Sequence, residues 1–112
     1  MNISIEYKIF KIIDYWFQSN VTEHILFTTE MSNIVNNKQY EIFYIYIPSY
    51  KDSVEICANT YINKIFTGSY CYSELDIVSN KQLFYKQKID FNKIIEIFNA
   101  ENIKYIKRWN VK

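Results

Sequence analysis

The sequence predicts a single α+β domain, a two-layer sandwich of about three helices on a mainly antiparallel sheet of four or five strands. Three observations lead to this fold class. The chain has 112 residues, enough for one hydrophobic core, so residues 1–112 are expected to form one globular domain. Apolar residues make up 49% of the chain, which excludes a disordered protein. Segments with the 3.6-residue repeat of a helix alternate with segments that have the two-residue repeat of a strand.

The first element is expected to be a helix over residues 4–19. Ser4 is a suitable N-cap, and the apolar residues that follow fall on one stripe of a helix. The stripe consists of Ile5, Ile9, Ile12, Ile13 and Trp16. Charged residues of both signs, Glu6 and Asp14 among them, lie off the stripe. This pattern favours packing on a core over binding to a membrane surface.

Two strands are expected next. Residues 24–29 are rich in β-branched and apolar side chains, and the polar stretch 32–39 indicates a loop or the end of a hairpin. Residues 40–47 are the clearest strand of the sequence because aromatic and β-branched residues occupy almost every position. Pro48 ends this strand.

Residues 53–66 are expected to form a second helix. Their apolar residues repeat with helical spacing, at Val54, Cys57, Ala58, Tyr61, Ile62, Ile65 and Phe66. The segment from Asp52 to Glu55 resembles a capping box, and the only glycine, Gly68, stands where a left-handed residue would end the helix. These signals agree and predict a core helix, which Ile62→Asp would destabilise by several kcal/mol.

A strand over residues 70–78 is predicted from strict alternation. One face carries Cys71, Ser73, Leu75 and Ile77, and the other carries Tyr70, Tyr72, Glu74 and Asp76. Residues 79–81 are expected to turn the chain into a returning strand over 82–89.

The last predicted helix begins after Asp90, which is a suitable N-cap. Its apolar stripe is Phe91, Ile94, Ile95 and Phe98. Residues 99–102 are expected to break this helix. Residues 103–109 are interpreted as a final strand, with continuation of the helix as the alternative.

The predicted order of elements is α-β-β-α-β-β-α-(β). From residue 40 onward this order matches the split β-α-β repeat of ferredoxin-like folds. The strand at 24–29 fits that fold poorly, because both edges of the first ferredoxin-like strand are already paired. The alternative is a sheet of hairpins with helices packed on it, as in profilin-like or roadblock-like domains.

The residue types that usually carry chemistry are scarce. The chain has one histidine, His24, and two cysteines, Cys57 and Cys71, which lie on apolar faces of their predicted elements. A zinc site needs three or four such ligands, and one glycine excludes a glycine-rich phosphate loop. Glu74 and Asp76 could act as paired carboxylates, although acidic residues on a strand face are usually solvated. We therefore expect no catalytic, cofactor-binding or metal site, no enzyme activity, and two buried, reduced cysteines.

Tyrosine is the most distinctive residue of the sequence, with 11 in the chain. In the strand at 40–47, Tyr40, Ile42, Tyr44 and Tyr46 project from one face. Tyr70 and Tyr72 alternate in the same sense, so one sheet could present five tyrosines on one face. Tyrosine is enriched at protein interfaces, and this face is either a binding surface or is covered by the first helix.

Charge is distributed unevenly along the chain. Residues 1–85 carry 6 basic and 9 acidic side chains, and residues 86–112 carry 7 basic and 3 acidic ones. The basic segment is either a solvated face or a landing site for an acidic partner. It makes Lys104, Lys107, Arg108 and Trp109 a second set of candidate partner-binding residues, beside Tyr44, Tyr46, Tyr70 and Tyr72.

Two classes of function follow, a protein-binding inhibitor and a small nucleic-acid-binding domain. The second is disfavoured because the basic residues lie in the C-terminal quarter of the chain, and Glu41, Glu74 and Asp76 are expected near the tyrosines, where they would repel phosphate. The absence of an apolar leader and of a long apolar run leads us to expect a cytoplasmic protein that does not bind membranes.

In general character the chain resembles small bacterial immunity proteins, which neutralise one cognate toxin by direct binding. The resemblance rests on a small α+β domain that is rich in aromatic residues and has no catalytic set. Its composition favours residues with A/T-rich codons, as is typical of low-GC genomes. It implies one protein partner and no cofactor. Small phage-encoded inhibitors, including anti-CRISPR proteins, share these traits and are the alternative.

Overall fold

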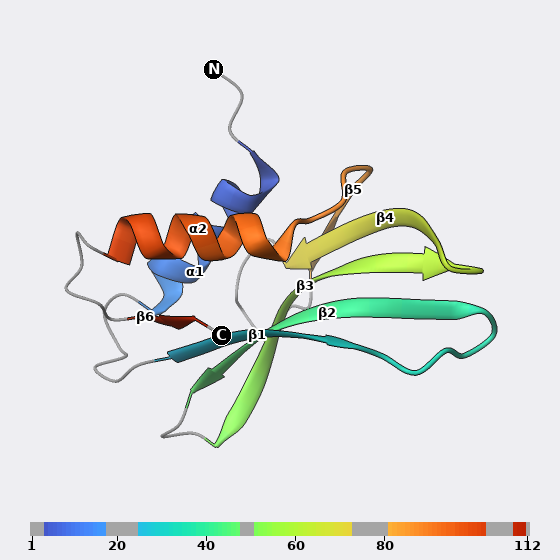
Figure 1. The fold of residues 1–112 in the computed structure, drawn as a ribbon, viewed down its shortest axis with the longest axis horizontal. Coiled ribbons are helices and arrows are strands. Elements are labelled where there is room, and N and C mark those ends of the chain that lie inside the picture. Colours follow the sequence, from blue (N-terminus) through green and yellow to red (C-terminus); the bar gives the residue numbers. More distant parts are fainter. Residues whose placement is uncertain (1–3, 18–24, 48–50, 73–80, 103–108, 112) are drawn as a thin grey trace.

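Residues 4–17, 25–47, 51–72, 81–102 and 109–111 are described by the computed structural model. They form two helices and six strands, and both helices lie on the same face of the sheet (Figure 1). This arrangement confirms the α+β class predicted from the sequence, with two helices rather than three within the described ranges. None of the described helices is long and apolar enough to cross a membrane.

The sheet is built mainly from sequential hairpins. Its order is β5-β4-β3-β2-β1-β6. The strands are β1 (Ile25–Met31), β2 (Lys38–Ile47), β3 (Asp52–Ile62), β4 (Ile65–Tyr72), β5 (Gln82–Tyr85) and β6 (Trp109–Val111). The first five pair antiparallel, and β6 lies parallel to β1 at the edge. This order excludes the ferredoxin-like alternative and agrees with a sheet of hairpins that carries helices.

The helix predicted over residues 53–66 is wrong. The segment forms β3, a two-residue turn and the start of β4. Asn63 and Lys64 occupy the turn with φ angles of 51° and 65°, as a tight hairpin turn requires. Gly68 ends no helix: it lies in β4 with a φ of 154°, and an added Cβ there would lie 3.1 Å from the carbonyl oxygen of Tyr85.

A β-bulge explains the misleading helical spacing. Phe43 pairs with Cys57, whereas Tyr44 pairs with Glu55, so Ile56 is an extra residue in β3. A bulge lets two successive residues face the same side of a sheet. Ile56 and Cys57 are accordingly both fully buried in the core, and the two-residue repeat is interrupted. A second register shift, at Thr67 in β4, lies just beyond the segment predicted as a helix.

Both helices begin at the caps that the sequence predicts. The helix α1 (Ile5–Phe17) is preceded by Ser4, whose hydroxyl accepts a hydrogen bond from the backbone N–H of Tyr7 at 3.2 Å. The helix α2 (Phe91–Asn102) is preceded by Asp90, whose carboxylate accepts the backbone N–H of Asn92 at 3.0 Å. The predicted break at residues 99–102 is wrong, because α2 continues to Asn102.

Other predicted boundaries are correct only in part. The predicted strand over 70–78 is observed up to Tyr72, and the returning strand ends at Tyr85 instead of residue 89. The strand β6 at Trp109–Val111 overlaps the predicted strand over 103–109 only at Trp109. Predictions on residues 18–24, 48–50, 73–80 and 103–108 lie outside the described residues.

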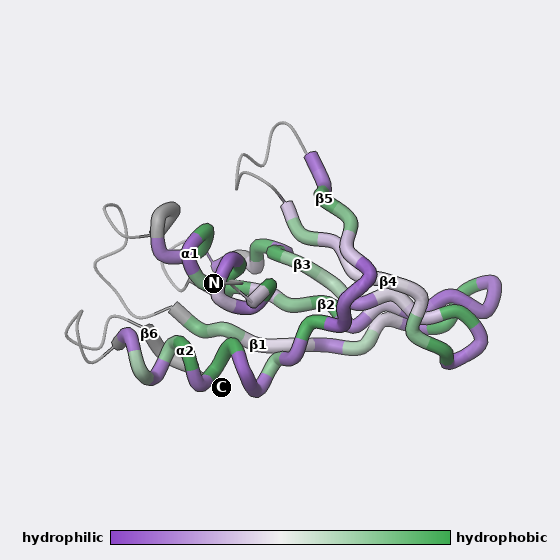
Figure 2. Tube along the Cα trace, turned by 90° about the horizontal axis from the view of Figure 1, so that it is seen from above, coloured by the Kyte–Doolittle hydropathy of each residue, from purple (hydrophilic) through white to green (hydrophobic). Residues whose placement is uncertain are grey.

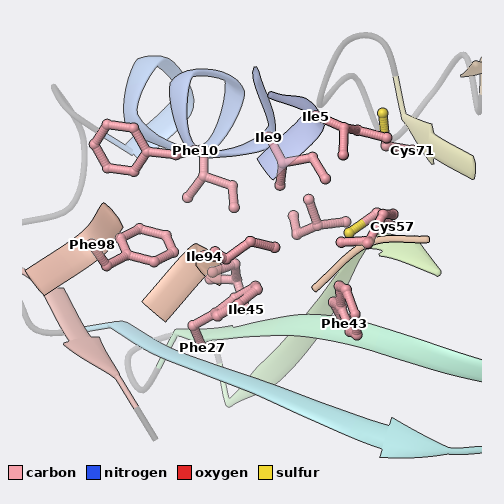
Figure 3. Close-up of a cluster of buried hydrophobic side chains, with 13 residues drawn as sticks. Ile5, Ile9, Phe10, Phe27, Phe43, Ile45, Cys57, Cys71, Ile94 and Phe98 are labelled. Carbon is pink, nitrogen blue, oxygen red and sulfur yellow. The ribbon is translucent and has the colours of Figure 1, made fainter. Parts of the chain in front are cut away.

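The core lies between the helices and one face of the sheet (Figure 3). The sheet contributes mainly Phe27, Phe43 and Ile45, together with Ile56 and both cysteines; α1 contributes Ile5, Ile9, Phe10 and Ile13, and α2 contributes Ile94 and Phe98. The two helices touch through Phe10 and Phe98, whose ring centroids are 5.3 Å apart.

Two acidic residues of α1 depart from the sequence interpretation. Glu6 and Asp14 lie off the apolar stripe, yet both are buried.

Candidate functional site

The alternation of β2 and β4 brings the predicted tyrosines onto one surface. Ile42 of β2 pairs with Ala58 of β3, and Ala58 pairs with Tyr70 of β4. Paired residues of adjacent strands share a face, so the tyrosines of β2 lie on the same side as those of β4. We call this surface the tyrosine face; it consists of Tyr40, Ile42, Tyr44, Tyr46, Tyr70 and Tyr72.

The described helices lie on the opposite side of the sheet. α1 packs on the face that carries Phe43 and Ile45, not on the tyrosine face. Figure 2, seen from above, shows the same arrangement, with α1 and α2 over one half of the sheet and the hairpin ends extending past them. The alternative in which the first helix covers the tyrosines is therefore wrong.

A carboxylate lies at the centre of the tyrosine face. Glu55 of β3 accepts a hydrogen bond from the Tyr70 hydroxyl at Oε1 (3.1 Å) and one from the Tyr72 hydroxyl at Oε2 (2.7 Å). Gln82 of β5 donates from Nε2 to the Tyr72 hydroxyl oxygen at 3.3 Å. Tyr44 is the β2 residue paired with Glu55, so tyrosines flank the carboxylate from both neighbouring strands.

These contacts raise the pKa of three tyrosines. Burial is the main cause for Tyr70, and the charge and hydrogen bonding of Glu55 add to it. Burial and the hydrogen bond to Glu55 also raise the pKa of Tyr72. Burial, with the charges of Glu55 and Glu30, raises the pKa of Tyr44. All three hydroxyls are protonated at neutral pH, as an ordinary tyrosine is, and those of Tyr70 and Tyr72 donate their protons to Glu55.

A hollow of about 340 Å³ lies beside this cluster. It is lined by residues of β2 to β5, including Tyr40, Thr60, Tyr70 and Phe84. Phe84 is 75% exposed, and its ring centroid is 6.3 Å from that of Tyr70. An exposed aromatic ring at the rim of a hollow is a suitable anchor for a partner protein.

The charges near the tyrosines differ from the sequence interpretation. Glu41 lies on the other face of the sheet, where its carboxylate accepts a hydrogen bond from Asn59 at 2.8 Å. Glu30 pairs with Ile42 and Glu55 pairs with Tyr44, so these two carboxylates belong to the tyrosine face. Glu74 and Asp76 lie outside the described residues.

The basic C-terminal candidates are described only in part. Lys104, Lys107 and Arg108 lie outside the described residues. Trp109 begins β6, and its backbone pairs with that of Ile25. The structure therefore brings together the tyrosine candidates and does not relate them to the basic set.

The cysteines and the metal-ligating residue types form no described site. Cys57 and Cys71 are buried and form no disulfide, although they are opposite each other in the register of β3 and β4. Burial raises the pKa of both thiols. His24 lies outside the described residues. Within the described ranges, no group of three or more histidine, cysteine, aspartate or glutamate side chains is placed to hold a metal ion.

Comparison with family models, with curated proteins and with solved structures finds no significant match. The function is therefore inferred from the chemistry of the surface itself.

Sequence reasoning missed two residues of this surface, Glu55 and Phe84. The sequence pattern places Glu55 in a helix cap, and it places Phe84 in the returning strand over 82–89 without marking it as a binding residue. Alternation within β5 was the available signal for Phe84, because Phe84 pairs with Tyr70 and thus joins the tyrosine face. No local signal identifies Glu55, whose position depends on the strand assignment of residues 52–62.

Proposed function

We propose that this protein is a non-catalytic inhibitor that binds another protein through its tyrosine face, and specifically an immunity protein that neutralises a cognate toxin. The observation that supports the proposal is the packing of both described helices on the opposite face of the sheet. This packing leaves a surface with five tyrosines and an adjacent hollow without a described helix over it.

The chemistry of the tyrosine face suits protein binding. Tyrosine combines a large apolar ring with a polar tip and loses little side-chain entropy when it becomes ordered, so it gives strong contacts at interfaces. The hydrogen bonds of Tyr70 and Tyr72 to Glu55 hold two of these rings in place before a partner arrives. A preorganised surface binds more tightly because fewer side chains must be fixed on association.

Binding alone would be enough to inhibit the partner. A partner whose active surface lies against the tyrosine face cannot reach its own substrate, and no reaction on this chain is required. One molecule of the protein would then neutralise one molecule of toxin. A phage-encoded inhibitor, such as an anti-CRISPR protein, would use the same surface and would differ only in the partner.

Nucleic acid is the weaker alternative. The rings of the tyrosine face could stack on bases, and Lys38 lines the hollow. Glu30 and Glu55, however, place two carboxylates on the same face, where they oppose the binding of phosphate.

Affinity purification of the tagged protein from its native host, at low and high salt, tests the proposal. Recovery of one partner protein in equimolar amount is the expected result. A complex that resists salt indicates contacts carried by the tyrosine rings. One that weakens with salt indicates a contact between charges, at Lys104, Lys107 and Arg108 or at the carboxylates of the tyrosine face. Recovery of nucleic acid that is lost on nuclease treatment would contradict the proposal.

A further inference from the structure

We infer that the Glu55 cluster of the tyrosine face is a receptor for a basic side chain, by preference an arginine, of the partner protein. The cluster consists of Glu55, Tyr44, Tyr70 and Tyr72. The inference rests on the proposed function, because it gives the chemistry of the partner that the tyrosine face would bind.

Two hydrogen bonds hold the carboxylate of Glu55 in position, but its oxygens can accept further hydrogen bonds. Each oxygen accepts one tyrosine hydroxyl, at 3.1 Å from Tyr70 and 2.7 Å from Tyr72. A carboxylate can accept about four hydrogen bonds, so about two acceptor sites remain. Both donors are neutral, and no lysine, arginine or histidine in the described part of the chain forms an ion pair with Glu55.

A partly buried carboxylate with only neutral partners favours the arrival of a cation. Glu55 is half-buried in the central strand β3, so an incoming charge would be screened less than at the open surface. The charge of Glu30, on the same face, acts on Tyr44 together with that of Glu55. The two carboxylates make this part of the face negative although the whole chain carries a net charge of +1.

The aromatic rings add a second attraction for the same ligand. The ring centroids of Tyr70 and Tyr72 are 6.1 Å apart and their planes meet at 84°, so one ring edge faces the other ring. The ring centroid of Phe84 lies 6.3 Å from that of Tyr70. The face of an aromatic ring attracts a cation, and a guanidinium group can stack on a ring while it donates hydrogen bonds to a carboxylate. Arginine therefore fits the cluster better than lysine.

A titration of the isolated protein with a short arginine peptide tests this receptor without the natural partner. The probes are N-acetyl-glycyl-arginyl-glycine amide and the same peptide with citrulline, which has nearly the same shape and no charge. Binding is followed by NMR through the backbone amides of β3 and β4. We expect saturable shifts at Glu55, Tyr70 and Tyr72, with a dissociation constant in the millimolar range, and none with citrulline.

Two variants locate the binding. Glu55→Gln removes the charge but keeps a carbonyl oxygen that can accept a tyrosine hydroxyl, so the fold is expected to persist. Glu96→Gln makes the same charge change at an exposed position of α2, on the helix side of the sheet. The arginine-dependent shifts should weaken about tenfold or more in Glu55→Gln and remain in Glu96→Gln.

The two proposals can fail separately. Equal shifts with citrulline, unchanged shifts in Glu55→Gln, or no saturable shift at all would overturn the receptor. An equimolar protein complex from the native host would still support the proposed function in that event. Recovery of nucleic acid in place of a protein would overturn the proposed function even if the arginine peptide binds.

Discussion

The side chain of Asn59 hydrogen-bonds to both backbone polar groups of Ile89. The Asn59 Nδ2 donates to the Ile89 carbonyl oxygen at 2.8 Å, and the Ile89 N–H donates to the Asn59 Oδ1 at 2.8 Å. Asn59 Nδ2 donates its second proton to Oε1 of Glu41. Nearby, the buried Ser69 donates to the carbonyl oxygen of Gln87 at 2.7 Å. These bonds fasten the segment before α2 to the sheet and so help to place α2 on the core face.

Asn59→Ala should destabilise the protein strongly. Asn59 and Ile89 are both fully buried, so the substitution leaves two backbone groups without partners. Each unsatisfied group costs about 1–3 kcal/mol, and we expect a loss of about 3 kcal/mol in urea unfolding. Asn92→Ala, at an exposed position of α2, is the control and should change stability by less than about 0.5 kcal/mol. Equal stability of the two variants would contradict this role of Asn59.

The substitution Ile62→Asp distinguishes the observed strand from the helix predicted over residues 53–66, because the two structures predict different losses of stability. Ile62 is 39% exposed at the end of β3, so the aspartate should cost at most about 1 kcal/mol. Ile56→Asp is the matched variant, because Ile56 is fully buried in the same strand and a charge there should cost several kcal/mol. Thermal unfolding of the two proteins measures the difference. A severe effect at Ile62 would support the helix instead.

Both cysteines should react slowly with thiol reagents in the native protein. Cys57 and Cys71 are buried, and their raised pKa values reduce the reactive thiolate. Labelling with a chromogenic disulfide should become fast in denaturant, with both thiols reacting. Rapid labelling of either cysteine in native buffer would show that its side chain is accessible.

Stability should fall when the pH rises above 9. Burial raises the pKa of Cys57 and Cys71 above the ordinary value of 9.0, so the unfolded chain loses these protons first. The stabilisation is complete below pH 9 and is lost as the pH rises toward the folded pKa. Burial and a hydrogen bond with Cys71 raise the pKa of Tyr85 from 10.0 to about 12. This tyrosine therefore adds a further loss of stability as the pH rises from 10 to about 12.

Urea unfolding at neutral pH, and again between the ordinary pKa values of cysteine and tyrosine, measures the contribution of the thiols. Cys57→Ala serves as the comparison, since this variant lacks one of the two groups. Its decline in stability over the interval should be smaller than that of the wild type. The same decline in both proteins would assign the effect to other residues.

Phe84→Ala should weaken partner binding without loss of stability. Its ring is 75% exposed, so truncation should change the free energy of unfolding by less than about 0.5 kcal/mol. As an anchor beside the hollow it should contribute about 2 kcal/mol or more to binding. Calorimetry with the partner recovered from the host measures this loss. Leu83→Ala is the control, because Leu83 is 41% exposed on the same strand but on the opposite face. If the partner binds both variants equally, its contact surface does not include Phe84.

Local patterns in the sequence determined those features that depend only on residues close to each other in the chain. Ser4 and Asp90 cap their helices through backbone groups two or three residues away, so both starts could be predicted. The alternation around Tyr44 predicted β2 and its two faces, because the direction of a side chain in a strand follows from position alone. The share of the candidate site that lies on β2 and β4 was predictable for the same reason.

Tertiary pairing decided the rest. The bulge at Ile56 places consecutive residues in the core and imitates helical spacing, and only the register against β2 reveals it. The turn at Asn63 and Lys64 lacks the glycine that usually marks a tight hairpin. Glu55 meets Tyr70 and Tyr72 because β3 and β4 pair, and this contact joins residues 15 and 17 positions apart. Within β2 and within β4, the sequence alone determined which residues share a face. The packing of both described helices against Phe43 and Ile45 decided which face these helices leave uncovered, since burial depends on contacts between distant segments.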